Sequence, residues 1–189
     1  VAFAADPDYE SPADADQNNI YVVTVLIDDG AADDANGATT LTITVADAND
    51  ITPVYTATST TPTVTEGATA VDSNVAITDA DSGDANSCTL GGADSGLFTC
   101  TLTGQTAYSV AFSSAPDYET PSSAGSSNEY TVTVTINDGS NDGSTITYTV
   151  TVGDANDQTP VYQAADADDA ITVNENVGTG SIDAGTITD

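Results

Sequence analysis

Two segments of the chain alternate between apolar residues and threonine. The first runs from Tyr130 to Ile136 and the second from Ile146 to Val152. A period of two is typical of a strand that packs one face on a core and turns the other to water. Residues 137–144, between the two segments, are mostly Asn, Asp, Gly and Ser, which favour turns. Residues 41–45 repeat the second pattern, so the sequence predicts an all-β fold.

The composition favours the same fold class. The 189 residues include no methionine or tryptophan and only five leucines, whereas the β-branched residues threonine and valine are abundant. No stretch approaches the roughly 18 consecutive apolar residues that a membrane-spanning helix needs. We therefore expect no membrane insertion in this segment.

The charge excludes several classes of function. The chain has 30 acidic residues and no lysine, arginine or histidine. Nucleic acids and anionic membrane surfaces are bound through cationic side chains, so we expect neither partner. General acid–base catalysis usually uses histidine, and oxyanion binding usually uses lysine or arginine. The remaining catalytic option is a pair of carboxylates, and we expect a protein that is not an enzyme.

Two sequence motifs occur twice with nearly the same spacing. Pro-Asp-Tyr-Glu stands at 7–10 and again 109 residues later at 116–119. Asp-Ala-Asn-Asp stands at 47–50 and again 107 residues later at 154–157, each time followed by Thr-Pro-Val-Tyr. A period of this length corresponds to one small domain, so the chain is a tandem repeat.

These motifs divide the chain into three parts. Residues 1–53 are expected to be the C-terminal part of one repeat, 54–160 a complete repeat, and 161–189 the N-terminal part of the next. Short strands with regular turns in a domain of this size predict a β-sandwich.

The motifs resemble those of the cadherin repeat. Asp-Ala-Asn-Asp before a proline is similar to the family's linker motif, and Asp117-Tyr118-Glu119 to its Asp-Arg-Glu element. Thr65-Glu66-Gly67 and Asp79-Ala80-Asp81-Ser82-Gly83 resemble its first-strand glutamate and its Asp-X-Asp-X-Gly element. The resemblance implies tandem Greek-key β-sandwich repeats of the cadherin/immunoglobulin-like type, joined by calcium-binding linkers.

The resemblance also implies which residues bind Ca²⁺. Calcium takes six to eight oxygen ligands, and carboxylates, asparagine amides and backbone carbonyls supply them. Zinc would need His or Cys ligands, which are not available in a suitable set. The ligands expected at the first junction are Asp8, Glu10, Asp47, Asn49, Asp50, Asp79, Asp81, Asn86 and Asp138. Those expected at the second junction are Glu66, Asp117, Glu119, Asp154, Asn156, Asp157 and Asp189.

Three positions depart from the family pattern. Tyr118 replaces the central arginine of the Asp-Arg-Glu element, and Ile51 and Gln158 replace the last asparagine of the linker motif. Because the family uses that asparagine chiefly through its backbone carbonyl, the calcium site is expected to survive. The tyrosine, the lack of basic residues and the threonine-rich strands resemble bacterial or archaeal cadherin-like repeats.

The two cysteines flank a glycine-rich turn. If 88–90 and 97–100 formed a hairpin with Leu90 opposite Phe98, Cys88 would stand opposite Cys100. This register allows a disulfide, which an extracellular compartment would favour. The alternative is a pair of buried thiols.

The expected function is structural. The leading hypothesis is a calcium-rigidified repeat in a long extracellular stalk, adhesin or filament at the cell surface, whose partners are neighbouring repeats. The alternative is a module that binds glycans or a homophilic surface partner. A glycosidase that uses two carboxylates is the weakest reading. Two further options are O-glycans on the hydroxyl-rich segment 56–63, and a fibre in which 161–189 completes the partial repeat 1–53 of a neighbouring chain.

Overall fold

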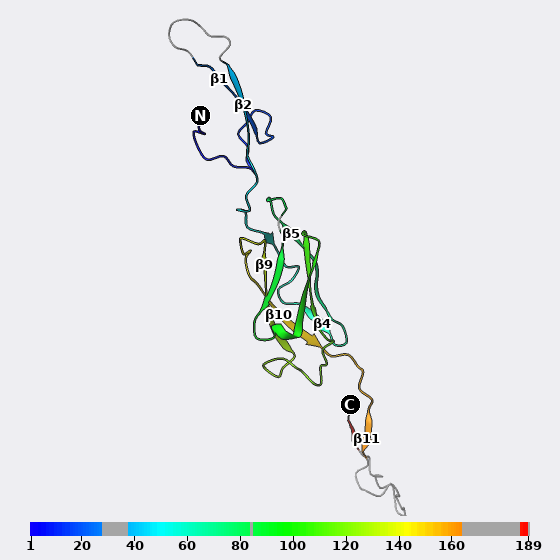
Figure 1. The fold of residues 1–189 in the computed structure, drawn as a ribbon. Coiled ribbons are helices and arrows are strands. Elements are labelled where there is room, and N and C mark those ends of the chain that lie inside the picture. The colour runs from blue at the N-terminus through cyan, green and yellow to red at the C-terminus, as the bar shows by residue number, and fades with distance from the viewer. Residues whose placement is uncertain (28–37, 84, 164–185, 189) are drawn as a thin grey trace, which may run out of the picture. The chain divides into compact units, whose positions relative to one another are not determined.

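The computed structural model describes residues 1–27, 38–83, 85–163 and 186–188 (Figure 1). The chain divides into two compact units, 1–153 and 154–189. Strands and one short 3₁₀ turn are the regular structure of the described residues. In this part of the chain no helix has the length and apolar character that a membrane span requires.

Residues 54–153 form two four-stranded sheets. One sheet has the order β4 (Thr63–Thr65), β10 (Ile146–Gly153), β9 (Glu129–Asn137) and β6 (Ser87–Gly91). The other has the order β3 (Val54–Tyr55), β5 (Ala70–Thr78), β8 (Ala107–Phe112) and β7 (Phe98–Thr103). All pairs are antiparallel except β4 with β10. The expected Greek-key β-sandwich is confirmed.

The alternating segments supply the middle of the core. Inward side chains of β9 and β10 are buried, and the threonines between them are partly or fully exposed. Val132 and Val134 on β9 and Tyr148 and Val150 on β10 have no exposed surface. Each fully buried aliphatic side chain stabilises the fold by roughly 1.5–3 kcal/mol, so this face holds the two sheets together.

A polar network lies inside the core. The hydroxyls of Tyr108 and Tyr148 are 3.1 Å apart, and Tyr148 donates to Oδ2 of Asp72 at 3.1 Å. The same Oδ2 accepts the backbone N–H of Thr58 at 2.9 Å. Asp72 is 6% exposed and lies where the register of β5 shifts against β8. Because a buried polar group without a partner is costly, the network fixes this irregular strand in one register.

The disulfide is present, but the predicted hairpin is wrong. Cys88 and Cys100 are bonded, with their Cα atoms 6.2 Å apart. Leu90 lies opposite Val134 on β9, and Phe98 lies opposite Phe112 on β8, so β6 and β7 belong to different sheets. The turn that includes the 3₁₀ segment Ser95–Leu97 carries the chain from one sheet to the other. The disulfide therefore joins the edge strands of the two sheets.

The partial repeat 1–53 contains a hairpin that resembles β9 and β10. β1 (Ile20–Val25) pairs antiparallel with β2 (Thr39–Thr44). Phe3 makes an edge-to-face contact with Tyr21 at 5.1 Å, and Phe112 contacts Tyr130 in the same way at 5.2 Å. The two pairs are related by the 109-residue offset, so the internal repeat extends to the side-chain packing.

The second unit shows the start of the same pattern. β11 (Val161–Gln163) pairs antiparallel with β12 (Thr186–Thr188), and Val161 lies opposite Thr188. In the sandwich, Val54 lies opposite Thr78 in the corresponding pair β3–β5. The boundaries after residues 53 and 160 remain predictions, and this matching register supports the second of them.

Removing the disulfide should weaken the sandwich without unfolding it. In the chain-entropy model, a cross-link that closes a loop of this length contributes about 3 kcal/mol, so the double variant Cys88→Ala/Cys100→Ala should lose about that much free energy of unfolding. Denaturant titration measures the loss. The control is Thr89→Ala/Thr101→Ala, which changes exposed residues on the same two strands. An equal loss in both double variants would contradict a stabilising cross-link between the sheets.

Candidate metal centre

Most of the predicted ligands of the first junction lie at one end of the sandwich. β5 ends at Thr78 and β9 at Asn137, so Asp79, Asp81 and Asp138 directly follow strand ends. Pairing of Val54 with Thr78 brings the preceding linker to the same end. We call Glu10 and linker residues 47–53, with loop residues 79–83, 85–86 and 138–143, the first junction.

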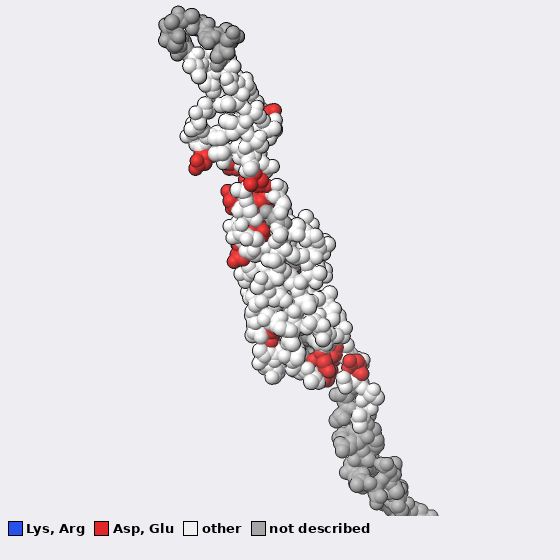
Figure 2. Space-filling view, in the orientation of Figure 1, with Lys and Arg blue, Asp and Glu red and all other residues white. Residues whose placement is uncertain are grey.

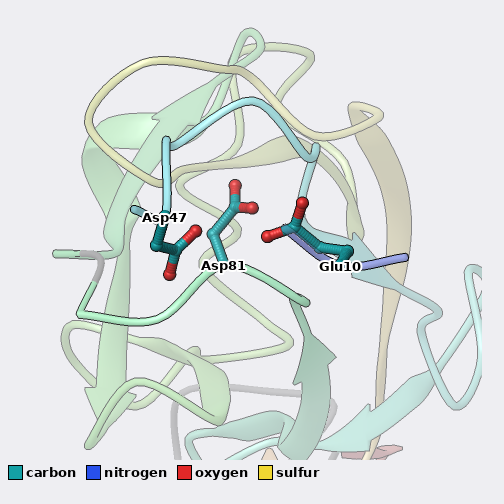
Figure 3. Close-up of side chains that lie close together, drawn as sticks. All are labelled: Glu10, Asp47 and Asp81. Carbon is teal, nitrogen blue, oxygen red and sulfur yellow. The ribbon is translucent and has the colours of Figure 1, made fainter. Parts of the chain in front are cut away.

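Three carboxylates converge in the first junction, although they come from distant parts of the sequence. One oxygen each from Glu10, Asp47 and Asp81 lies within 4.8 Å of the other two. Figure 3 shows the three side chains pointing toward a common space. At such distances like charges repel by several kcal/mol at the effective dielectric of a protein surface. The arrangement therefore favours a bound cation.

The ionisation of the cluster reflects this crowding. Partial burial, reinforced by the carboxylates of Asp47 and Asp81, raises the pKa of Glu10. Hydrogen bonds from the hydroxyl and backbone N–H of Ser82 lower the pKa of Asp47, and the backbone bond is 2.7 Å long. The charged form is thus favoured at Asp47 and disfavoured at Glu10.

Several oxygen atoms in this region have no hydrogen-bond donor within the protein. Five of them are buried and accept no hydrogen bond, and they belong to Glu10, Asp47, Asp79, Asp81 and Asn86. Buried oxygens are nearly always paired, and an unpaired one costs about 1–3 kcal/mol or more. Four carboxylate oxygens and one amide oxygen form a hard, anionic set, which fits calcium.

Asn86 is oriented by a residue that the sequence analysis missed. Its backbone N–H donates to Oε1 of Gln105 at 2.6 Å, and its Nδ2 donates to the backbone oxygen of Gln105 at 2.8 Å. Both contacts use donors, so the Oδ1 of Asn86 stays available. Asn86 lines a cavity of about 370 Å³, together with Asp79, Asp81 and Gln105. Gln105 stands in a turn and belongs to no recognisable motif.

The linker is docked on the sandwich by direct hydrogen bonds. Nδ2 of Asn49 donates to the backbone oxygen of Asp138 at 3.1 Å, and the backbone N–H of Ile51 donates to Oδ2 of Asp81 at 2.8 Å. Nδ2 of Asn141 donates to Oδ1 of Asn49 at 3.1 Å. Asn141 was also missed, because one asparagine in a loop of turn-forming residues gives no distinct signal.

Asp138 is buried behind the linker. It is 2% exposed, and its Oδ1 accepts the backbone N–H groups of Ser140 and Asn141 at 2.7 and 2.6 Å. Desolvation acts against the charged form, but these hydrogen bonds prevail and lower the pKa of Asp138. It therefore adds a buried negative charge to the loop whose backbone accepts the hydrogen bond from Asn49.

The predicted ligands Asp8 and Asp50 are not among the three converging carboxylates. Asp8 is exposed, and its Oδ1 accepts the backbone N–H of Ser11 at 3.0 Å. Asp50 is also exposed. The structure does not bring either carboxylate among the three converging ones, so their role as ligands remains a prediction.

A second acidic group lies at the other end of the sandwich. Glu66 follows β4, is 8% exposed and accepts the backbone N–H of Tyr118 at 2.7 Å. One of its oxygens lies within 4.8 Å of an oxygen of Glu119. Asp117 is exposed and accepts the backbone N–H of Thr120 at 2.9 Å, as Asp8 does with Ser11.

The other predicted ligands of the second junction belong to the second unit. Asp154, Asn156 and Asp157 lie between β10 and β11 and are exposed. Asp189 lies outside the described residues. The full ligand set of this junction therefore remains a prediction.

The fold and the motif positions can be compared with known proteins. No family model matches the sequence, and no curated protein matches it. Among solved structures, human CDH23 EC21-23 is 27% identical with a TM-score of 0.60, and the match covers 95% of this chain and 56% of that one. Protocadherin gammaB7 EC3-6, solved as a cis-dimer, is 26% identical with a TM-score of 0.54, covering 81% of this chain and 36% of that one. The chain is built from cadherin-like repeats.

More distant cadherin structures agree on the fold. Human mucin-like protocadherin EC1-2 is 16% identical with a TM-score of 0.51, over 82% of this chain and 74% of that one. This cadherin-like chain spans between 23% and 36% of the first protocadherin chains it matches. The structural likeness therefore applies to the individual repeats and not to the whole of these longer proteins.

Asp81→Asn should change stability in opposite directions with and without calcium. In a chelator, removing one of three crowded charges should raise the free energy of unfolding by on the order of 1 kcal/mol. In saturating calcium the same change removes a charged ligand and should lower it. Thermal unfolding in both buffers measures the two effects.

The matched control is Asp6→Asn, which changes an exposed carboxylate outside the cluster. It should alter stability in neither buffer. A loss of stability for Asp81→Asn in the chelator would show that the carboxylates do not repel one another as this arrangement requires.

Proposed function

We propose that this chain is a calcium-rigidified structural or adhesion segment of an extracellular protein. The full protein would be a long stalk, adhesin or filament at the cell surface, built from repeats of about the length of 54–160. The observation that carries the proposal is the set of five buried, unpaired oxygens where linker and sandwich meet. The likeness to cadherin repeats supports it independently.

Calcium would act on the angle between repeats. Glu10 and Asp47 belong to the partial repeat 1–53, whereas Asp81 belongs to the complete one, so an ion held by all three connects two repeats. The chain offers no lysine, arginine or histidine that could neutralise them. Without a cation the junction keeps its few hydrogen bonds but carries unopposed charge, which favours separation of the two parts.

The extracellular placement rests on two features. A disulfide joins the two sheets, and disulfides persist mainly in oxidising compartments. Millimolar calcium, which weak sites of extracellular modules need, is also found outside the cell. In this proposal the carboxylates are ligands, and the chain performs no catalytic step. The resemblance to bacterial or archaeal repeats remains a prediction.

Calcium should raise the thermal stability of the chain in a concentration-dependent way. An ion that binds only the folded junction stabilises it by about 2.7 kcal/mol at a hundred times its dissociation constant. Magnesium should be much less effective, because it requires six ligands in tight octahedral geometry. Calorimetric scans over a calcium series, a magnesium series and a chelator buffer measure this.

Two variants sharpen the calcium experiment. Asp50→Ala removes the linker carboxylate that the family resemblance assigns to the ion, and Asp6→Ala removes one exposed carboxylate outside the motifs. Asp50→Ala should weaken calcium affinity, whereas Asp6→Ala should leave it unchanged. If calcium shifted none of the transitions, the proposed function would be wrong.

A further inference from the structure

One outer face of the sandwich is lined with threonine. Strands β9 and β10 lie side by side in the middle of their sheet, and Thr133 pairs with Thr147 and Thr131 with Thr149. Neighbouring residues of each strand point into the core, so these threonines point outward. We define the threonine face as Thr131, Thr133, Thr135, Thr147, Thr149 and Thr151. The flanking strands β4 and β6 contribute three more threonines.

The threonine face carries almost no charge in a very acidic protein. The chain has a net charge of −30, yet Glu129, at the start of β9, is the one acidic residue within the described strands of this sheet. The view in Figure 2 shows acidic atoms gathered mainly near the two ends of the sandwich, with a mostly uncharged body between them. Exposed sheet surfaces usually carry charges that prevent association, and this one does not.

A second copy of the chain fits this surface better than another partner. Two copies approaching through their acidic ends would repel, and the threonine face is where that repulsion is smallest. A threonine hydroxyl both donates and accepts a hydrogen bond, so a threonine surface is complementary to itself. Self-complementarity is what an interface between identical subunits with two-fold symmetry needs. A cationic partner would instead be drawn to the acidic ends.

The size of the face predicts how strong the contact is. The four strands hold 25 residues, and at about 3.3 Å along the strand and 4.8 Å between strands they present roughly 400 Å². Stable interfaces bury about 800 Å² on each partner, so one repeat alone would associate weakly. Thr40, Thr42 and Thr44 on β2 pair with β1 as Thr147, Thr149 and Thr151 pair with β9. The β10 side of the face therefore recurs on β2, whereas the β1 positions opposite Thr44 and Thr42 hold the exposed apolar residues Ile20 and Val22. Weak contacts from several repeats in one chain would add up through avidity.

We propose that the threonine face is a lateral self-association surface, through which copies of this chain pack side by side. The inference rests on the tandem-repeat role proposed above but does not require calcium as a ligand. Calcium or salt would assist it by neutralising or screening the acidic ends of neighbouring copies. The product is a bundle of several chains in place of a single chain of repeats.

The experiment is sedimentation velocity of the full chain over a concentration series. The weight-average sedimentation coefficient should rise with protein concentration, and more steeply at high salt. Thr147→Glu places a charge in the middle of the face and should weaken association about tenfold or more, because like charges would then meet across the contact. Thr101→Glu adds the same charge at an exposed position of β7 in the other sheet and should have little effect.

Several outcomes would overturn the proposal. A wild-type chain that stays monomeric at every concentration and salt would do so, even if it binds a polysaccharide. Equal weakening by the two variants would also overturn it, because charge alone would then be responsible. Thermal unfolding verifies that both variants fold, and Thr149→Glu replaces Thr147→Glu if that variant does not.

Association and calcium binding can fail separately. In a chelator at high salt, association should persist although no calcium is bound. A flat calcium titration with intact, Thr147-dependent association would refute the proposed calcium function and keep the surface. Normal calcium binding without any association would refute the self-association surface and keep the proposed calcium function.

Discussion

The repulsion among carboxylates at the first junction is the constraint on which the rest of this structure depends. Glu10, Asp47 and Asp81 converge within 4.8 Å, and the chain has no cationic side chain to offset them. Burial, reinforced by the neighbouring carboxylates, raises the pKa of Glu10, and unpaired buried oxygens surround it. A cation from solution would offset this charge, and the proposed calcium function depends on that effect.

The sandwich tolerates this repulsion because its own stability comes from features outside the junction. Its core is held by β9, β10 and the Tyr108–Tyr148–Asp72 network, and the disulfide joins the two edge strands. None of these features lies in the junction. In the view of Figure 2, the acidic atoms lie mainly near the two ends of the sandwich. In the proposed function, ion binding at these ends would therefore govern the connection between repeats without deciding whether each repeat folds.

The sequence predicted the regular parts of the fold because their signals are local. Alternation from Tyr130 to Ile136 marks a strand whichever partner it takes, and repeated motifs mark repeated positions. The pairing of 88–90 with 97–100 was wrong because a tight glycine-rich turn can either close a hairpin or cross between sheets. Gln105 and Asn141 could not be predicted, since their roles depend on contacts that form only after folding.

The most direct test of the account is to measure residual dipolar couplings for the β1–β2 hairpin and for the sandwich, with calcium and with a chelator. If calcium joins the two parts through the first junction, the couplings of both should fit one common alignment tensor when calcium is present. In the chelator the two parts should need separate tensors, while each keeps its internal structure. A single tensor under both conditions, or separate tensors under both, would contradict a junction made rigid by calcium.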